Sequence, residues 1–437
     1  MAIKSEKILI NCVLLMGFLS SSSGAYLYEM EDLPSSSSYS LDSSNTSKSV
    51  DIPTDPHSPY SGDFGEYFSE QYSVLKLVLS YLNYYDLNTL REVNSSLKIA
   101  TDILLKKRTW IQAASLNYMH GTDHRPEPIH SGHFIDLRIE PKVLFTFEGM
   151  AGGPSSRSRP KICMRLRDRN DNRFFPRSDI VPKSVKTFVP VGAKGIIYPD
   201  KNEKNELITV QTMMHKKLAL LYLPTTDSYD VSVFTRVVTS DSFAQEPILE
   251  FFQSDPRPIR GIIFLKVGAP HIDGMIRFIV KMVSNNQSEP FALSGGHVSS
   301  LDYDNPPKKN IPGVLKAIIF RGDGIRCVSD FISSTTDDGV LEGLKLTALH
   351  VDKTIGKLNI HKTFIMMFQC VDRHSLPIED NTLIAKVFPN IPIFGMQTWG
   401  EIGFRSFKTN EFKFAPKKRK LSIMHSVKTT YIIVTID

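Results

Sequence analysis

The sequence predicts an α+β protein in which a small module of three helices precedes a larger domain of mixed, mainly antiparallel sheets. Three observations lead to this prediction. First, about forty residues from Tyr72 to Trp110 carry apolar side chains at helical spacing. Second, the chain beyond residue 135 contains many short apolar segments separated by turn signals, as strands do. Third, most of these segments follow one another without an intervening helix, which favours antiparallel pairing.

The helical module is predicted over residues 67–115. Its apolar residues form three successive stripes: Tyr72, Leu75, Leu79 and Leu82; Leu87, Leu90 and Val93; and Leu97, Ala100, Leu104 and Ile111. Asp86 is the predicted N-cap of the second helix, because its carboxylate can accept from the free N–H groups of a first turn. Stripes of this kind also form the core of an ordinary helical subdomain, so periodicity alone leaves both interpretations open.

The larger domain is predicted over residues 135–437, with an N-terminal half at about 135–255 and a C-terminal half at about 256–437. Strands are predicted at residues 143–147, 194–198, 218–223, 231–238, 261–267, 313–320, 325–331, 364–370, 403–407, 411–414 and 429–435, and helices at 272–283 and 381–388. The turn Gly322-Asp323-Gly324 predicts a β-hairpin between two of these strands, because Asp-Gly tolerates the positive φ of tight turns.

The composition narrows the class of protein. A length of 437 residues suggests roughly two or three domains, and 41% hydrophobic residues suffice for a sizeable core. The net charge of +6 is small for this length and does not indicate a nucleic-acid binder. The four cysteines are far apart and show no zinc-ligand spacing, so we expect neither a metal nor another cofactor.

The first 65 residues contain two segments that do not predict a packed fold. Residues 1–25 have a basic start, an apolar run from Ile8 to Leu19 and small residues after it, as in a secretory signal peptide. This run is too short to span a membrane comfortably, so no membrane segment is expected. Residues 26–65 are rich in Ser, Asp and Pro and predict a disordered linker. The sparse cysteines favour a reducing compartment, which conflicts with secretion.

The helical module also contains a particular order of residues: Ser80-Tyr81-Leu82, then Asp86-Leu87, then Leu90-Arg91-Glu92-Val93-Asn94. This order resembles an F-box, the module that docks a protein onto the Skp adaptor of a cullin-based ubiquitin ligase. The Leu-Pro pair that usually opens an F-box is missing before Tyr72, and Leu97 stands where tryptophan is common. The resemblance implies that the adaptor is contacted by Leu75, Leu79, Leu82, Leu87, Leu90 and Val93.

Three further segments lie in the larger domain: Val387 to Gly395 with Trp399-Gly400-Glu401-Ile402-Gly403, Ala292 to Gly296, and Phe368 to Arg373. They resemble the FIST domain, an α/β module of signal-transduction proteins. His374 replaces the glycine that usually follows the arginine. FIST domains are thought to bind small ligands such as amino acids. The resemblance therefore implies a ligand or substrate loop at Gly295, Gly296, Cys370, Arg373, Gly400, Glu401 and Gly403.

An F-box followed by FIST segments, from Tyr67 to the C-terminus, resembles the F-box only protein twenty-two family. This implies a substrate-recognition subunit of an SCF-type (Skp–cullin–F-box) ubiquitin ligase, which promotes ubiquitination and proteasomal degradation of its targets. Such a subunit is non-catalytic, resides in cytoplasm and nucleus, and has the Skp adaptor, the cullin scaffold and a protein substrate as partners. Two alternatives stay open: a FIST protein that senses a small ligand and has a decayed F-box, or a secreted binding protein if residues 1–25 are cleaved.

No convincing catalytic constellation is present in the sequence. Cys370 and His374 could pair as nucleophile and base, but Cys370 ends an apolar run and is better interpreted as a buried strand cysteine. Glu401, between glycines, could bind an amine or a basic partner group. It could equally belong to a turn that only glycines permit.

Two short motifs concern localisation and adhesion. Lys417, Lys418, Arg419 and Lys420 follow a proline and match a nuclear import signal, although a solvated basic loop explains them equally well. The tripeptide Arg321-Gly322-Asp323 matches an integrin-binding sequence. A tripeptide arises easily by chance, so it carries weight only if the chain is secreted.

Overall fold

The structure is a computed structural model of the whole chain. It describes residues 72–93, 95–117, 137–149, 181–202, 204, 206–212, 217–224, 226–238, 244–268, 272–301, 313–375, 379–406 and 423–437. The segments predicted at 1–25 and 26–65, the strand at 411–414 and the basic run at 417–420 lie outside these residues. The chain divides into two compact units, Met1–Leu104 and Leu105–Asp437.

Three helices occupy the stretches in which three were predicted: α3 (Tyr72–Tyr81), α4 (Tyr84–Leu90) and α5 (Ser95–Lys107). The predicted N-cap was wrong. Asn83 caps α4 by accepting from the Asp86 N–H at 3.0 Å, so the helix begins earlier and Asp86 lies in its first turn. The third stripe also ends earlier than predicted, because the Ile111 N–H leaves the helix and donates to the His361 carbonyl at 2.8 Å.

Only part of each predicted apolar stripe lies in the core of the first unit. Buried there are Leu75, Leu79, Tyr84, Leu87, Leu90 and Ala100. An ion pair of 2.7 Å joins Arg91, at the end of α4, to Asp102 on α5. Burial of this kind stabilises short helices that would be marginal alone.

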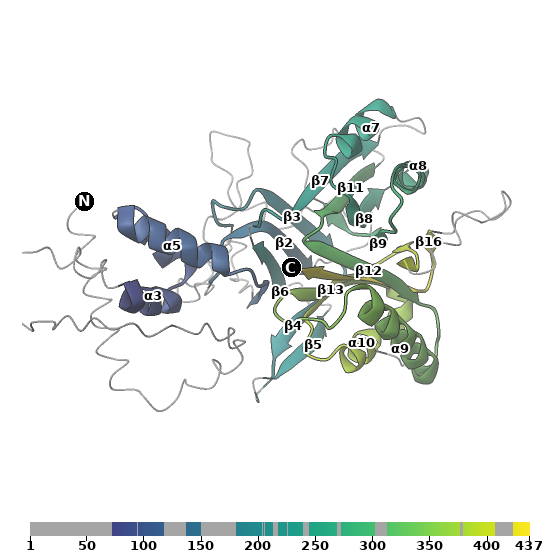
Figure 1. Cartoon of the computed structure of the whole chain (residues 1–437). Helices are drawn as coiled ribbons and strands as arrows, with labels where there is room; N and C mark the ends of the chain where they lie inside the picture. Colours follow the sequence, from purple (N-terminus) through teal and green to yellow (C-terminus); the bar gives the residue numbers. More distant parts are fainter. Residues whose placement is uncertain are drawn as a thin grey trace, which may run out of the picture. The chain divides into compact units, whose positions relative to one another are not determined.

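The described part of the second unit contains three sheets (Figure 1). The first sheet has the order β1-β6-β2-β3-β10, with β1 Gln112–Asn117, β2 Pro141–Gly149, β3 Thr187–Ala193, β6 Lys217–Pro224 and β10 Ser300–Leu301. The second has the order β16-β15-β9-β8-β11-β7, with β7 Tyr229–Val238, β8 Ile259–Gly268, β9 Ala292–His297, β11 Gly313–Gly322, β15 Glu401–Gly403 and β16 Met424–His425. The third has the order β12-β17-β13-β14-β4-β5, with β4 Ile196–Lys201, β5 Leu207–Thr212, β12 Ile325–Ile332, β13 Thr363–Cys370, β14 Ile393–Thr398 and β17 Thr429–Ile436.

Each sheet contains one parallel pair of strands, namely β2 with β3, β8 with β9, and β13 with β14. The other pairings in the described part of the chain are antiparallel, so the prediction of mixed, mainly antiparallel sheets is confirmed. Antiparallel neighbours need only short connections, whereas each parallel pair needs a longer crossover.

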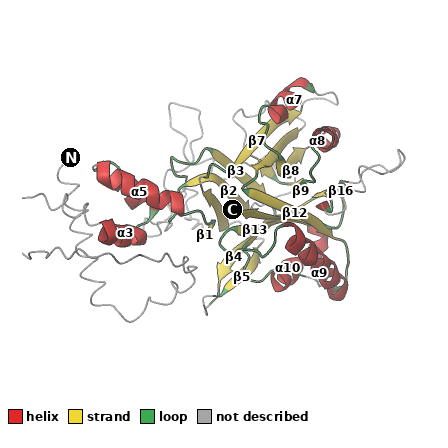
Figure 2. Cartoon of the chain, in the orientation of Figure 1, coloured by secondary structure: helices red, strands yellow, loops and turns green. Residues whose placement is uncertain are grey.

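One hydrophobic core draws side chains from all three sheets, including Phe147, Leu265 and Phe394. Helices cover the outer faces of two sheets (Figure 2). The helices α7 (Glu246–Gln253) and α8 (Ile272–Asn286) pack on the second sheet. The helices α9 (Asp337–Thr354) and α10 (Asp380–Val387) pack on the third, and a short 3₁₀ turn, η1 (Val371–Ser375), follows β13. Because the core is shared, no sheet of this unit is expected to fold alone.

Most predicted strands and α8 lie close to their predicted positions, but several elements were missed, among them β1, β3, β5, β9, β14, α7 and α9. The predicted strand at 403–407 was wrong, because β15 ends at Gly403 and Phe404 turns into the core against Phe291. Helix α9 carries Gly339 and Gly343, which weaken the helical signal in its sequence.

The predicted β-hairpin at Gly322-Asp323-Gly324 was also wrong. The turn exists, with φ of 107° at Gly322, but β11 pairs with β7 on one edge and with β8 on the other. Since both edges of β11 are occupied, β12 enters another sheet and pairs with β17. The turn is fixed instead by bonds of 3.0 Å from the Gly322 N–H to Pro258 O and from the Gly324 N–H to Ser228 O.

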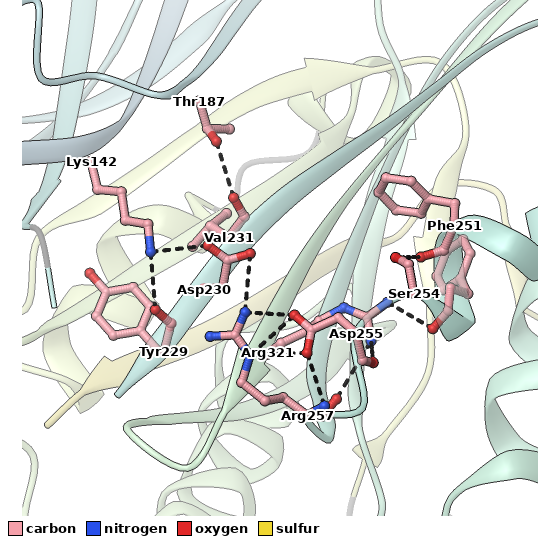
Figure 3. A network of polar contacts seen from close by, with 11 residues as sticks. Lys142, Thr187, Tyr229, Asp230, Val231, Phe251, Ser254, Asp255, Arg257 and Arg321 are labelled. Atoms are coloured by element: carbon pink, nitrogen blue, oxygen red, sulfur yellow. Dashed lines mark hydrogen bonds and ion pairs between the residues drawn. The ribbon is translucent and has the colours of Figure 1, made fainter. Parts of the chain in front are cut away.

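Arg321 is buried, so the integrin-binding interpretation of its tripeptide was wrong. Figure 3 shows its guanidinium beside the loop that follows α7. Its Nη2 donates to Phe252 O and its Nη1 to Asp255 O, both at 3.1 Å. Asp255 in turn accepts from Arg257 at 2.6 Å. Arg321 therefore closes the end of α7 by satisfying carbonyls that the helix leaves open.

We expect Arg321→Met to lower the free energy of unfolding by about 3 kcal/mol, because the buried carbonyls lose a charged donor. The matched control is Asp323→Ala in the same tripeptide. The Asp323 side chain is 86% exposed and its ion pair with Arg260 is screened, so its removal should change stability by less than about 0.5 kcal/mol. Urea denaturation of both variants measures this, and equal effects would refute the structural role of Arg321.

Candidate functional site

The three sheets meet where their parallel strands end. The Ser299 N–H, after β9, donates to Gly192 O at 3.0 Å, and the Gln397 N–H donates to Gly195 O at 2.9 Å. The Trp399 N–H, after β14, donates to His297 O at 3.1 Å. We call these three segments, residues 192–195, 297–299 and 397–400, the junction. The carboxyl ends of parallel strands are where α/β sheets commonly place their sites.

Two glycines allow the strands to come close beside the junction. A Cβ on Gly295, whose φ is 148°, would lie 2.0 Å from the carbonyl oxygen of Phe264. A Cβ on Gly296 would lie 2.5 Å from Cγ2 of Thr398. The glycines of the FIST-like segments thus permit close approach of backbone and side chains. Gly400 differs, since its nearest neighbour would be His425 O at 3.9 Å.

Glu401 lies at the centre of the candidate site and is 1% exposed. It pairs with Gly296 across β15 and β9. Its carboxyl group accepts from Thr398 Oγ1 at 3.2 Å, from the Lys428 N–H at 3.3 Å and from the Cys370 thiol. Burial raises the pKa of Glu401 to about 7, although these donors favour the charged form.

Cys370 lies next to Glu401 and is buried at the end of β13, as predicted. Burial, and then the negative charge of Glu401, raise the pKa of its thiol. The thiolate is the nucleophilic form of cysteine, so this environment opposes nucleophilic catalysis. The arrangement around Glu401 and Cys370 can hold or release a proton, but it offers no activated nucleophile.

Arg373 was predicted to join the same loop, but it lies in a separate buried ion pair. Its Nε donates to Asp380 Oδ2 at 2.5 Å and its Nη2 to Ser334 O at 2.6 Å. Thr429 also donates to Asp380, at 2.5 Å. Arg373 therefore links η1 to the start of α10. Loss of one partner of a buried ion pair strongly lowers protein stability, so Arg373 has a structural role.

The predicted loop residues are thus only partly brought together. Gly296 and Cys370 lie beside the buried carboxyl group of Glu401, Gly295 and Gly403 lie at neighbouring positions of β9 and β15, and Gly400 directly precedes β15. The sequence analysis missed the two donors Thr398 and Lys428. Thr398 is placed beside Cys370 by the pairing of β14 with β13, and no spacing in the sequence signals that register.

The predicted adaptor contacts are mostly interior. Leu75, Leu79, Leu87 and Leu90 are buried, Leu82 is half-buried and Val93 is exposed. Among its described residues, the large apolar side chains that the first unit exposes are Leu77, Tyr81, Val93, Ile99 and Ile103, with exposed fractions between 38% and 61%. Apolar periodicity identifies the buried face of a helix, so it could not have found them.

Within the described residues, no group of three or more His, Cys, Asp or Glu side chains could hold a metal ion. No helix among them is long and apolar enough to cross a membrane.

Comparisons with known proteins identify no family for this chain. No protein-family model matches it, and no curated protein is significantly similar. A solved structure with a partly similar arrangement is the crystal structure of a cyanuric acid hydrolase from A. caulinodans. Its sequence is 6% identical, and the alignment covers 68% of this chain and 90% of that one with a TM-score of 0.29. A score that low supports no inference about this chain.

The glycine contacts predict opposite effects for two alanine substitutions. Gly295→Ala should lower the free energy of unfolding by about 3 kcal/mol or more, because the new Cβ meets the Phe264 carbonyl in a strained conformation. Gly343→Ala, on α9, meets nothing within 4 Å and should raise stability by about 1 kcal/mol. Chemical denaturation tests both, and a well-folded Gly295→Ala protein would contradict the close approach.

The burial of Glu401 predicts a pH-dependent stability difference. The pKa of Glu401 is about 7 in the folded state and 4.5 in the unfolded state. Between pH 4.5 and 7 the folded protein therefore binds a proton that the unfolded protein has released. Wild-type protein should therefore lose stability relative to Glu401→Gln as pH rises from 4.5 to 7, by about 3 kcal/mol, with a constant difference above. Denaturation across this range measures it.

The measurement compares the free energy of unfolding of wild type with that of Glu401→Gln, because His297 changes the stability of each protein with pH in the opposite direction. Burial lowers the pKa of His297 to about 4, so its contribution to stability grows with pH up to 6.5. Both proteins retain His297, and its effect cancels. Glu342→Gln, which removes a carboxyl group at an exposed position of α9, is the control for the loss of a surface charge. A flat difference for Glu401→Gln would refute its buried, protonated state.

Proposed function

We propose that this chain is the substrate-recognition subunit of an SCF-type ubiquitin ligase. In this proposal α3, α4 and α5 form an F-box that binds the Skp adaptor, and the second unit is a FIST-type domain that holds the substrate. The order of F-box-like residues before FIST-like segments supports this assignment. The observation that carries it is an exposed apolar surface on helices whose own core is already filled.

The exposed apolar residues fall into pairs. Leu77 and Tyr81 lie four residues apart on α3, and Ile99 and Ile103 lie four residues apart on α5. Residues at this spacing share one face of a helix. Apolar and aromatic side chains of this type are common at the centre of a protein interface. We therefore assign the adaptor contact to these four residues and Val93, while the buried leucines support them from beneath.

The proposed mechanism is proximity rather than chemistry, so the chain itself is not an enzyme. The adaptor and the cullin scaffold would bring a charged ubiquitin-conjugating enzyme close to lysines of the bound substrate. Tethering raises the effective concentration of the reacting groups without new catalytic residues. The raised pKa of Cys370 is consistent with a non-catalytic role. Ubiquitination would then lead to proteasomal degradation in the cytoplasm and nucleus.

The two alternative functions have less support. A FIST protein that senses a small ligand would use the loop around Glu401. The side chains of Glu401 and Cys370 are, however, buried and hydrogen-bonded to one another. A secreted binding protein was motivated partly by the Arg321 tripeptide, and Arg321 is buried too. Its other motive, the signal-like segment at residues 1–25, lies outside the described residues.

The proposal predicts that Ile99→Asp and Ile103→Asp, alone or together, abolish co-purification of the full-length protein with the Skp adaptor. A charge at an exposed apolar contact must be desolvated in the interface, which opposes binding. Lys98→Asp, at the exposed neighbouring position on α5, is the control and should retain the adaptor. Affinity purification with quantitative mass spectrometry measures the adaptor recovered with each protein.

Circular dichroism must show that the variants keep their helices, since loss of binding through unfolding would be uninformative. Because the two isoleucines are exposed, little loss of stability is expected. If wild type recovers the adaptor and both isoleucine variants recover the same amount, the assigned surface is wrong. Failure of the wild-type protein to recover any adaptor would contradict the ligase function and favour a decayed F-box.

A further inference from the structure

Three basic side chains surround the half-buried ring of Phe331 on β12. The Arg405 Cζ lies 4.7 Å from the ring centroid and the Lys428 Nζ lies 4.3 Å from it. The centroid of the His425 ring lies 4.8 Å away. The three residues come from separate segments, after β15, on β16 and before β17, so the fold assembles this cluster. We call these four residues the Phe331 patch.

The patch contains more positive than negative charge. Arg405 Nε donates to Asp330 at 2.7 Å, and Asp330 also accepts from Thr347 at 2.5 Å. Lys428 Nζ contacts His425 Nδ1 at 3.4 Å, and it forms no ion pair with a described carboxylate. Asp330 thus pairs with Arg405, and the carboxyl group that attracts Lys428 is the buried Glu401. Burial and the nearby charge of Arg405 both lower the pKa of Lys428, as expected for like charges held together.

A strained turn holds Lys428 in this unfavourable position. Val427, just before it, has φ of 55° although valine is β-branched and rarely adopts this conformation. The Lys428 N–H donates to Glu401 and its carbonyl accepts from the Cys370 N–H at 3.0 Å. The backbone of Lys428 is therefore clamped by the buried site while its side chain lies over Phe331. Backbone strain of this kind concentrates at functional sites.

A small open pocket adjoins the patch. Its volume is about 60 Å³, and its walls include Phe331, Arg405, Ser334 and Gly343, together with Asp330, whose carboxylate is paired with Arg405. A Cβ at Gly343 would meet nothing within 4 Å, so the wall leaves this space unfilled. The pocket has room for one acidic head group and is far smaller than the usual site for a drug-sized ligand or cofactor.

We propose that the Phe331 patch binds carboxylate side chains of an acidic polypeptide segment. The guanidinium of Arg405 and the ammonium of Lys428 match carboxylate oxygens, and Arg binds this group especially well. An acidic partner would supply the counter-charge that the patch lacks. A peptide fits better than a small molecule, because the pocket is open and holds little more than one side-chain head group. The inference does not depend on the ligase function.

The test is fluorescence anisotropy of the full-length protein with a labelled poly-glutamate peptide and a poly-glutamine counterpart. We expect binding of the acidic peptide only, weakened by salt. Lys428→Gln should weaken it about fivefold, the size of one exposed charge contact. Lys428→Arg should retain binding. Lys386→Gln, the same change at an exposed position of α10, should leave it within about twofold.

Equal weakening by Lys428→Gln and Lys386→Gln would overturn the proposal, because attraction would then be diffuse. Absence of binding of the acidic peptide would also overturn it. Two further results would do the same: binding of a phosphoserine peptide but not of poly-glutamate, and full displacement of the labelled poly-glutamate by inorganic phosphate. Arg405→Lys, which keeps the ion pair with Asp330 but loses the planar fork, provides a second variant if Lys428→Gln fails to fold. Co-purification of the adaptor with Lys428→Gln should be unchanged, which separates this test from that of the ligase function.

Discussion

The close approach of strands at Gly295 and Gly296 is the constraint on which the second unit depends. A side chain at Gly295 would collide with Phe264 on the neighbouring strand β8, and one at Gly296 would collide with Thr398 on β14, so β9 could neither pair with β8 nor meet the third sheet as it does. The meeting of the second and third sheets closes the hydrophobic core that all three sheets share and buries Glu401. The glycine segments that resemble a ligand loop therefore have a sufficient structural explanation in the packing.

The buried Glu401 connects this packing of strands to the residues around Phe331. Its carboxyl group accepts from the backbone of Lys428, and the same turn carries the strained Val427 and presents the Lys428 side chain to Phe331. The interior carboxyl group thus positions a cation outside the core. The sequence analysis had considered both ligand binding and a structural role for the loop around Glu401, and these two roles belong to different residues. Residues near Glu401 hold the fold, while Arg405 and Lys428 carry the donors that a partner can reach.

Local patterns in the sequence predicted those elements that local interactions determine. Helix α8 followed from apolar residues at helical spacing, and β13 and β17 from apolar runs. The hairpin failed because the neighbours of β11 are decided by tertiary pairing, which no turn signal contains. Arg373 was misplaced for a similar reason, since its partner Asp380 comes from the next helix. In the helical module, periodicity identified the core face and so missed the exposed Ile99 and Ile103.

The two units divide the proposed function between them, with an apolar contact surface on α3 and α5 and a charged patch on the second unit. Hydrogen exchange of the full-length protein with and without purified Skp adaptor tests this division most directly. The account predicts slower exchange of amides within residues 72–104 when the adaptor is present, and unchanged exchange in residues 137–437. Unchanged exchange throughout the helices, or protection confined to the second unit, would contradict it.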